Sequence, residues 1–392
     1  MTAVAPVPTR SGWYSAEDCS LEDFRAVVET PTRLEDYPGA DEVREGVLVY
    51  GSGAAGVAGG DGRRGLQAEL ARALLDGPGI VVLAGAFGDR GVLDRTSALF
   101  ESLIAEQKDA GVVGGDHFAV PGANDRIWGA LDKFALRDPQ LFVDYYGNDL
   151  LALVAEAWLG LGYQVTSQVN VVNPGGRAQV AHRDYHLGFM SEEQSQGYPA
   201  HVHRLSPLMT LQGAVAHCDM PVETGPTMYL PHSQKYPVGY LAFHRPEFTA
   251  YFDQNHVQLP LRAGDAVFFN PALFHGAGTN RSTDVRRMAN LLQVSSAFGR
   301  AMESVDRAAV CRAVYPALLA GQAAGMDRRA LRAAVAAAAE GYAFPTNLDL
   351  DQPVGGLAPE TQAELVLRSL AGSASPGALA EALAEQDRRR RS

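Results

Sequence analysis

The sequence predicts a mainly β core with flanking helices, an α+β arrangement whose strands form an antiparallel jelly roll. Between Tyr163 and Ser296, short runs of β-branched and aromatic residues are separated by Gly, Pro and Asn turns, as in antiparallel sandwiches and barrels. Upstream of this stretch, leucines recur at helical spacing. Beyond Gly299 the chain is rich in alanine and arginine, which again favours helices.

The same patterns divide the chain into three segments. Residues 1–45 carry prolines among polar residues without a sustained period, so we expect an N-terminal arm lying on the body. Residues 46–300 contain the strands and the helices before them, and we expect them to form the main domain. Residues 301–392 are expected to form a C-terminal helical extension.

Helical spacing is found on both sides of the strands. The predicted helices lie at Leu66–Leu74, around Leu99 and Leu103, at Asp138–Trp158, Val305–Ala320, Arg328–Ala339 and Pro359–Leu370, with a buried strand at Gly79–Leu83. The basic run Arg388–Arg391 is expected to be a solvated, frayed end.

A glycine-rich stretch, Gly51–Gly56, follows a short predicted strand and matches the GxGxxG pattern of dinucleotide-binding proteins. In those proteins the turn opens directly into a helix, whereas here Gly59, Gly60 and Gly62 follow and would break it. We therefore expect a surface loop, and a dinucleotide-dependent dehydrogenase is the alternative.

Seven strands are expected in the core. They lie at Tyr163–Val172, Gln179–Asp184, Met209–His217, Thr227–Leu230, Val257–Leu261, Ala266–Asn270 and Arg286–Val294. This number of short pieces is suited to a jelly roll.

Composition excludes several classes of partner. Lysine and arginine total 33 against 45 acidic residues, giving a formal charge of −12, and such a surface repels nucleic acid. No window approaches the roughly 20 apolar residues that span a membrane. Three widely spaced cysteines fit neither a disulfide framework nor a zinc ribbon, so we expect a cytoplasmic protein.

The chemistry is expected among the histidines. His182 and Asp184 are two residues apart on a predicted strand, so both side chains point to one face. With a histidine from another strand, such a pair can form the facial triad that holds non-haem Fe(II) and leaves positions open for other ligands.

The HxD pattern alone is weak, since about one match is expected by chance in a chain with ten histidines. A second match exists at His217-Cys218-Asp219, where we expect the side chains to cap a strand. A histidine pair at His201 and His203 falls in a polar insertion, residues 191–207, where we expect an exposed loop without a metal.

A third ligand is offered by His275, which is followed by the small residues Gly276, Ala277 and Gly278. Eleven residues later Arg286 opens the last predicted strand, and a guanidinium near a metal is suited to gripping a dicarboxylate. On this interpretation its neighbour, Arg287, faces the other way.

These motifs, in this order, resemble the phytanoyl-CoA dioxygenase family. The resemblance rests on His182-Arg183-Asp184, the run Gly225–Ser233, Gly264-Asp265, the run His275–Ser282, and Arg286, and it covers roughly residues 66–296. It implies a double-stranded β-helix of the cupin-like kind and a dioxygenase that requires Fe(II), with 2-oxoglutarate and O2 as cosubstrates.

Carried over residue by residue, the resemblance makes His182, Asp184 and His275 the metal ligands and Arg286 the 2-oxoglutarate ligand. It implies oxidation, by default hydroxylation, of an unactivated C–H bond in a small-molecule metabolite, with release of succinate and CO2. Related halogenases lack the carboxylate that Asp184 supplies here, so halogenation is disfavoured. Ala181 and Ala277 depart from the family pattern, which commonly has an aromatic residue and a serine there.

Substrate contacts are expected from Tyr185, His186 and Phe189, which follow the HxD pair, with residues 191–207 as a lid. Two further alternatives stay open, a jelly-roll protein that binds a ligand without turnover and a zinc hydrolase. The alanine-rich C-terminal helices could also serve a homo-oligomer.

Overall fold

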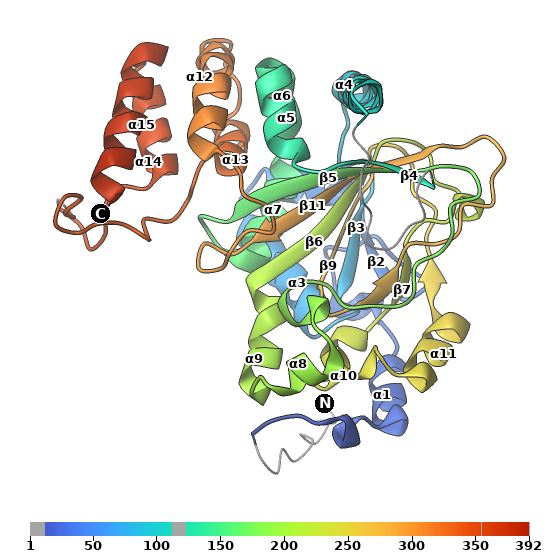
Figure 1. Ribbon diagram of the computed structural model, residues 1–392. Helices are drawn as coiled ribbons and strands as arrows, with labels where there is room; N and C mark the ends of the chain where they lie inside the picture. The colour runs from blue at the N-terminus through green and yellow to red at the C-terminus, as the bar shows by residue number, and fades with distance from the viewer. Residues whose placement is uncertain (1–11, 112–122, 354, 392) are drawn as a thin grey trace.

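The computed structural model describes residues 12–111, 123–353 and 355–391. A large sheet and a small sheet form the core, and helices cover the large sheet and both ends of the molecule (Figure 1). This arrangement confirms the predicted jelly roll with flanking helices. Residues 1–11 of the predicted arm lie outside the described residues.

Eight strands of the described residues form the large sheet. They are β1 (Glu42–Arg44), β2 (Val47–Tyr50), β3 (Ile80–Leu83), β4 (Asn124–Ile127), β5 (Gln164–Val172), β6 (Thr210–Ala216), β9 (Ala266–Phe269) and β11 (Arg287–Ser295). Their order is β1-β2-β3-β9-β6-β11-β5-β4, and neighbours are antiparallel except β2 and β3. The register of β11 sets Arg287 opposite Val172 and Ser295 opposite Gln164.

The small sheet faces part of the large one. Its strands are β7 (Met228–Leu230), β8 (Val257–Gln258) and β10 (Phe274–Gly276), in the order β10-β7-β8. Tyr229 of β7 packs with Val267 and Phe269 of β9 and with Val49 of β2 in an apolar cluster between the sheets. Burial of these side chains joins the two sheets around one cavity.

Most predicted strands are present within a few residues, and two differences affect the site. The segment Gln179–Asp184 is not a regular strand: it pairs with the short strand β10 through an isolated bridge from His182 to His275, flanked by bonds from the Gln179 amide to Ala277 and from the Asp184 amide to Pro271. The last strand begins at Arg287, one residue later than expected.

Among the described residues, five helices follow the short helix α2 (Ser52–Ala58) and precede β5 in the chain. They are α3 (Arg63–Leu75), α4 (Arg90–Asp109), α5 (Ala130–Arg137), α6 (Pro139–Tyr146) and α7 (Asp149–Leu159). The long helix expected at Asp138–Trp158 is thus two helices, α6 and α7. Asn148 separates them, since its side chain caps α7 by accepting bonds from the amides of Leu150 and Leu151 at 3.0 and 3.3 Å.

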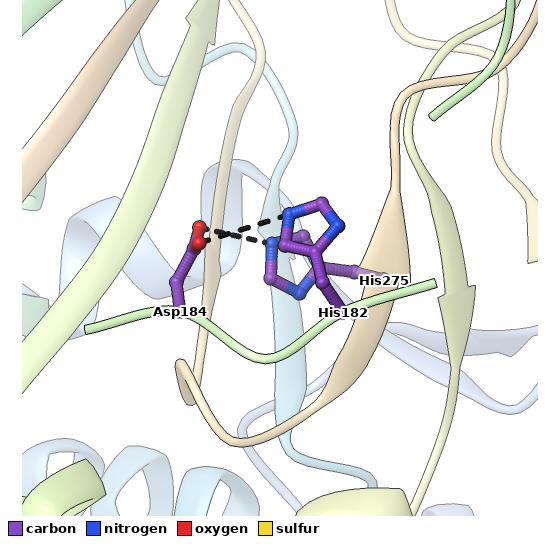
Figure 2. A group of neighbouring side chains, drawn as sticks. All are labelled: His182, Asp184 and His275. Atoms are coloured by element: carbon purple, nitrogen blue, oxygen red, sulfur yellow. Dashed lines mark hydrogen bonds and ion pairs between the residues drawn. The ribbon is translucent and has the colours of Figure 1, made fainter. Parts of the chain in front are cut away.

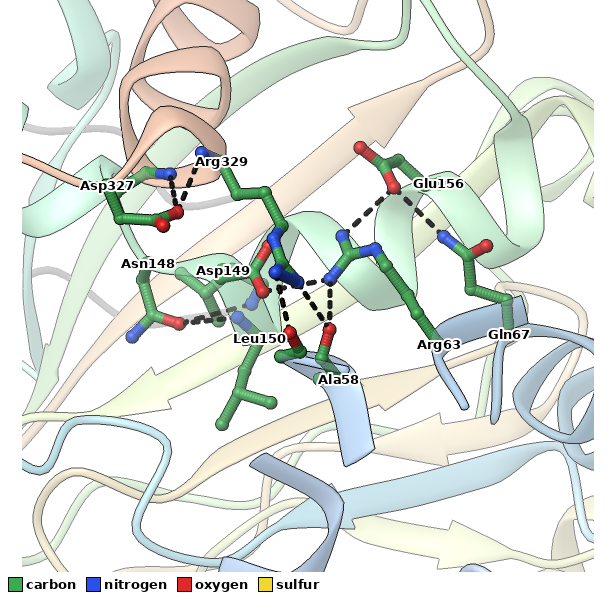
Figure 3. Close-up of polar contacts among 12 residues, drawn as sticks. Ala58, Arg63, Gln67, Asn148, Asp149, Leu150, Glu156, Asp327 and Arg329 are labelled. Atoms are coloured by element: carbon green, nitrogen blue, oxygen red, sulfur yellow. Dashed lines mark hydrogen bonds and ion pairs between the residues drawn. The ribbon is translucent and has the colours of Figure 1, made fainter. Parts of the chain in front are cut away.

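The glycine-rich stretch is not a loop, as we had expected, but forms the short helix α2 (Ser52–Ala58). The helix ends before Gly59 and Gly60, the residues expected to break it. Figure 3 shows how this end is anchored: Arg329 donates to the Ala58 carbonyl at 2.9 Å, and Arg63 bridges Asp149 and Glu156 of α7 at 2.9 and 3.0 Å. The arginines thereby fix the packing of α2, α3 and α7.

The end of the molecule opposite the C-terminal helices is covered by short helices (Figure 1). They are α1 (Leu21–Val28), α8 (Glu192–Gln196), α9 (Ala200–Leu205), α10 (Gly239–Ala242) and α11 (Pro246–Asn255). Phe24 of α1 is fully buried against Tyr236 and Phe248, which seats this part of the arm on the body. The expectation of an exposed histidine pair was wrong for His203, which is buried and bonds the Ser195 carbonyl at 3.0 Å.

In the described part of the C-terminal segment, four helices form a stack beside α6 (Figure 1). They are α12 (Arg307–Ala323), α13 (Arg328–Ala338), α14 (Gln362–Ala371) and α15 (Pro376–Arg390). The last helix corrects the expectation of a frayed end, because Arg390 bonds the Glu360 carbonyl at 3.0 Å and pairs with buried Asp351. Side chains of α12, α14 and α15 share the main apolar core with the large sheet, and the division into three segments stays a prediction.

Candidate metal centre

His182, Asp184 and His275 come together inside the jelly roll (Figure 2). One nitrogen or oxygen of each side chain lies within 4.8 Å of the others. His182 and Asp184 belong to the extended segment after Gly176, and His275 belongs to β10, to which this segment is bridged. The two-residue spacing therefore directs both side chains to one face, as predicted.

Both imidazoles are held in the same tautomer by the backbone. Nδ1 of His182 bonds the Val180 carbonyl at 2.8 Å, and Nδ1 of His275 bonds the Leu273 carbonyl at 2.9 Å. A carbonyl can only accept, so each Nδ1 carries the hydrogen and each Nε2 of a neutral ring offers a lone pair.

These lone pairs face the carboxylate of Asp184. Nε2 of His275 lies 3.2 Å from Oδ2, and Nε2 of His182 lies 3.7 Å from Oδ1. In neutral rings these are contacts between acceptors, which a cation placed among them would make favourable. Two imidazoles and one carboxylate are also the donor set that suits non-haem Fe(II), so the residues present fit this ion.

The charge states of Asp184 and His182 suit a cation at neutral pH. Burial alone would raise the pKa of Asp184, but His182, His275 and a hydrogen bond from Gln212 outweigh it, and the pKa lies below its usual value. Burial and the neighbouring His275 lower the pKa of His182. An ionised carboxylate and a neutral imidazole are the forms that bind a metal.

The three side chains open into a cavity of about 150 Å³ between the two sheets. On β11 the residues that line it alternate, from Arg287 through Ala289 and Leu291 to Gln293, as expected for one face of a strand. Sequence reasoning missed the amides that contribute to the same wall, which are Gln168 and Asn170 of β5, Gln212 of β6 and Gln293 of β11.

Arg287 is the buried cation of this cavity. Its side chain is 6% exposed, and its Nη1 has no hydrogen-bond partner among the described residues. Burial lowers the pKa of the guanidinium to about 10, so it remains charged at neutral pH. A buried charge without a partner is costly, and an anionic ligand in the cavity would remove this cost.

Arg286, the residue expected to contact 2-oxoglutarate, does not line the cavity. Its side chain is 41% exposed and pairs with Glu101 of α4 at 2.8 Å and with Asp125 of β4 at 3.0 Å. The physical reason is that β11 starts one residue later than expected, and a one-residue shift moves a side chain to the other face. The sequence did hold a signal for this orientation. Met288, Leu292 and Val294 are apolar and share one face of the strand, which is the core face, so Arg287 belongs to the opposite face, which lines the cavity.

Of the three residues proposed to contact substrate, one lines the cavity. Phe189 does so with a half-exposed ring. Tyr185 is buried beside Asp184 outside the lining, and His186 bonds the Ser206 hydroxyl at 3.1 Å.

The second HxD match lies on the helix side of the large sheet. Nδ1 of His217 is 2.8 Å from the Ser97 hydroxyl of α4, and its Nε2 is 3.0 Å from the Tyr145 hydroxyl of α6. Asp219 accepts a bond from the Ala263 amide at 2.9 Å. The ring nitrogens of His217 are therefore used in joining two helices to the sheet.

Burial of His217 predicts an acid-sensitive fold. Burial lowers its pKa to about 3 from an ordinary value of 6.5, so below pH 6.5 the unfolded chain binds a proton that the folded protein excludes. Between pH 7.5 and pH 5 this residue should cost about 2 kcal/mol of stability. Urea unfolding of the wild type and of His217→Gln at both pH values measures the difference.

Other buried histidines, such as His232, are the same in both proteins and cancel in this comparison. An equally steep loss of stability in His217→Gln would contradict the assignment.

The sequence around this centre matches a known protein family. The sequence model of the family described as Phytanoyl-CoA dioxygenase (PhyH) matches residues 76–288, which is more than half of the chain. The chain belongs to the phytanoyl-CoA dioxygenase family. The matched residues include His182, Asp184 and His275.

Individual known proteins are similar to this chain over part of its length. Dioxygenase cdmD of Talaromyces verruculosus is 34% identical over 117 residues, 30% of this chain and 34% of that protein. The chain therefore matches only about a third of the length of this relative.

Among solved structures, the α-ketoglutarate-dependent epimerase SnoN of nogalamycin biosynthesis is 20% identical, with a TM-score of 0.38 over 58% of this chain and 81% of that chain. AviO1 of Streptomyces viridochromogenes Tue57 is 18% identical, with a TM-score of 0.42 over 59% of this chain and 95% of that chain.

Membership of the phytanoyl-CoA dioxygenase family confirms the predicted enzyme class, an oxidoreductase of the dioxygenase type. It confirms equally the prediction of iron, 2-oxoglutarate and O2, and it favours this class over the hydrolase and ligand-binding alternatives. No helix of the described residues is long and apolar enough to cross a membrane. The cytoplasmic location stays a prediction.

Proposed function

We propose that this protein hydroxylates an unactivated C–H bond of a small-molecule metabolite, as an Fe(II)- and 2-oxoglutarate-dependent dioxygenase. One observation carries the proposal: the His182, Asp184 and His275 donor set lies in the same cavity as Arg287, whose Nη1 has no hydrogen-bond partner among the described residues. A hydrolytic zinc site would also require the three donors, but it would not require a buried guanidinium such as that of Arg287 in the same cavity.

In this proposal His182, Asp184 and His275 hold Fe(II) as a facial triad. Bound there, Fe(II) with 2-oxoglutarate and O2 supplies oxidation of a C–H bond, with release of succinate and CO2. The chain contributes the fixed tautomer of both imidazoles and the ionised state of Asp184. Gln212, which donates to Asp184, restrains the rotation of this carboxylate.

Arg287 takes the role that the sequence suggested for Arg286. A guanidinium can bind the distal carboxylate of 2-oxoglutarate through two hydrogen bonds, and Nη1 of Arg287 lacks a partner among the described residues. Apolar side chains such as Leu259 and Leu261 line the cavity and exclude water, which strengthens the pairing.

The other residues that line the cavity indicate the kind of substrate it would accept. Gln168 donates to Gln293 at 3.3 Å, and with Phe189 and Trp128 these residues provide amide and aromatic contacts in the lining. Among the described lining residues only Arg126 and Arg287 are cationic, a poor platform for the phosphates of coenzyme A. We therefore propose an uncharged, polar metabolite.

Anaerobic titration of the apoprotein with Fe(II) and then 2-oxoglutarate tests the function. The wild type should show a metal-to-cosubstrate charge-transfer band, and Asp184→Ala should lose or alter it. A protein that binds zinc tightly and shows no band would favour the hydrolase, and a protein that binds neither metal would favour a ligand-binding role.

A further inference from the structure

Arg183 lies between the two proposed ligands His182 and Asp184, and its side chain points away from them. It is 2% exposed, and it is among the largest fully buried side chains. Alternation along an extended segment requires this geometry, because residues on either side of Arg183 face the cavity. The side chain therefore belongs to the core behind the metal centre.

The guanidinium is bound by backbone and aromatic groups. Nη2 donates to the carbonyls of Ser233 at 2.6 Å and Tyr236 at 3.0 Å. The rings of Tyr240 and Phe274 lie 5.0 and 5.2 Å from its central carbon, within the range of cation–π attraction. These contacts come from the loop after β7, from α10 and from β10.

Burial of the Arg183 guanidinium is energetically unfavourable for the fold. A Cβ atom at Gly239 would overlap the guanidinium, so any larger residue at the start of α10 would displace Arg183 from this position. Nε of Arg183 has no hydrogen-bond partner among the described residues, and the acceptors of its Nη2 are backbone carbonyls and not carboxylates. A buried unpaired charge destabilises a fold, so a role in stability alone explains it poorly.

The contacts of Arg183 connect the two ligand segments. Ser233 accepts from Arg183 through its carbonyl, and its hydroxyl accepts from the Phe274 amide at 2.8 Å. Phe274 both contacts the guanidinium and precedes the ligand His275. Backbone bonds already join the HxD segment to β10 and its flanks, from the Gln179 amide to Ala277 at 2.8 Å and from the Asp184 amide to Pro271 at 3.0 Å, beside the bridge at His182. The guanidinium and the loop add contacts from the core side of the same segment.

We infer that Arg183 is a positioning residue, which fixes the His182–Asp184 pair relative to His275 by locking the backbone behind them. The inference rests on the proposed metal site. Arg183 would contact neither the metal nor the substrate, and it would still set the geometry of the three donors.

The test compares Arg183→Met with Arg307→Met. Arg307 is a matched control, because it is also buried and also donates to two carbonyls, those of Ala337 at 2.7 Å and Val165 at 2.6 Å, but these belong to α13 and β5 and not to either ligand segment. Both variants should lose thermal stability. Only Arg183→Met should weaken anaerobic Fe(II) binding, about 10- to 100-fold, and broaden or shift the charge-transfer band formed with 2-oxoglutarate.

Arg183→Lys keeps the charge but cannot reproduce the planar fork, and we expect an intermediate loss of Fe(II) affinity. Wild-type Fe(II) affinity and an unchanged band in either folded Arg183 variant would overturn the inference, as would an equal loss in Arg307→Met. If Arg183→Met does not fold, Arg183→Lys decides. Failure of the wild type itself to bind Fe(II) would instead overturn the proposed function.

Discussion

Replacing Arg287 with alanine should raise the KM for 2-oxoglutarate about 100-fold, because a buried carboxylate loses its charged partner. Fe(II) affinity in the absence of 2-oxoglutarate should stay near that of the wild type, since Arg287 belongs to the cavity wall and not to the donor set. Steady-state succinate release measured against 2-oxoglutarate concentration gives the KM.

The neighbouring residue provides the control for this prediction. Arg286→Ala removes ion pairs to Glu101 and Asp125 that are partly exposed, and such pairs contribute about 1 kcal/mol or less. Its KM for 2-oxoglutarate should change less than about threefold. A large effect in Arg286→Ala with little effect in Arg287→Ala would restore the original expectation from the sequence.

Replacing either proposed histidine ligand with alanine should reduce turnover about 1000-fold or more, which corresponds to about 4 kcal/mol in the activation barrier. His182→Ala and His275→Ala should also lose stoichiometric Fe(II) after desalting, because two donors with Asp184 no longer form a facial triad. Metal content and succinate release are measured on the same samples.

His217→Gln is the matched variant, since it changes the other HxD histidine, whose nitrogens contact Ser97 and Tyr145 on the helix side of the sheet. It should retain wild-type Fe(II) content at pH 7.5. Loss of iron in His217→Gln, with iron retained in His182→Ala, would show that His217 and not His182 binds the metal.

Local sequence patterns predicted most of the metal centre. The direction of the side chains at His182 and Asp184 follows from their spacing in any extended segment, and that geometry needs no tertiary information. The small residues after His275 indicated a close approach of backbone and ligand, and β10 indeed brings His275 beside the HxD segment. The central strands β5, β6 and β11 were also predicted within two residues at each end.

The arginine proposed to bind 2-oxoglutarate shows where local patterns were insufficient. Arg286 and Arg287 are adjacent and chemically identical, so composition cannot distinguish them. The exact residue at which β11 joins the ladder with β5 decides which guanidinium is buried, and this register depends on the packing of the whole sheet. The amides Gln168, Gln212 and Gln293 were missed for a related reason, since three strands distant in sequence bring them to one wall.

By itself, then, the sequence determined the fold class and the enzyme class, and it singled out the three side chains of the proposed metal site, because these depend on periodicity and on motifs read along one chain. Tertiary structure decided which arginine enters the cavity, that Arg388–Arg390 extend a packed helix, and that Arg183 links the two ligand segments. Each of these depends on contacts between residues far apart in the chain, where burial and register outweigh local preference.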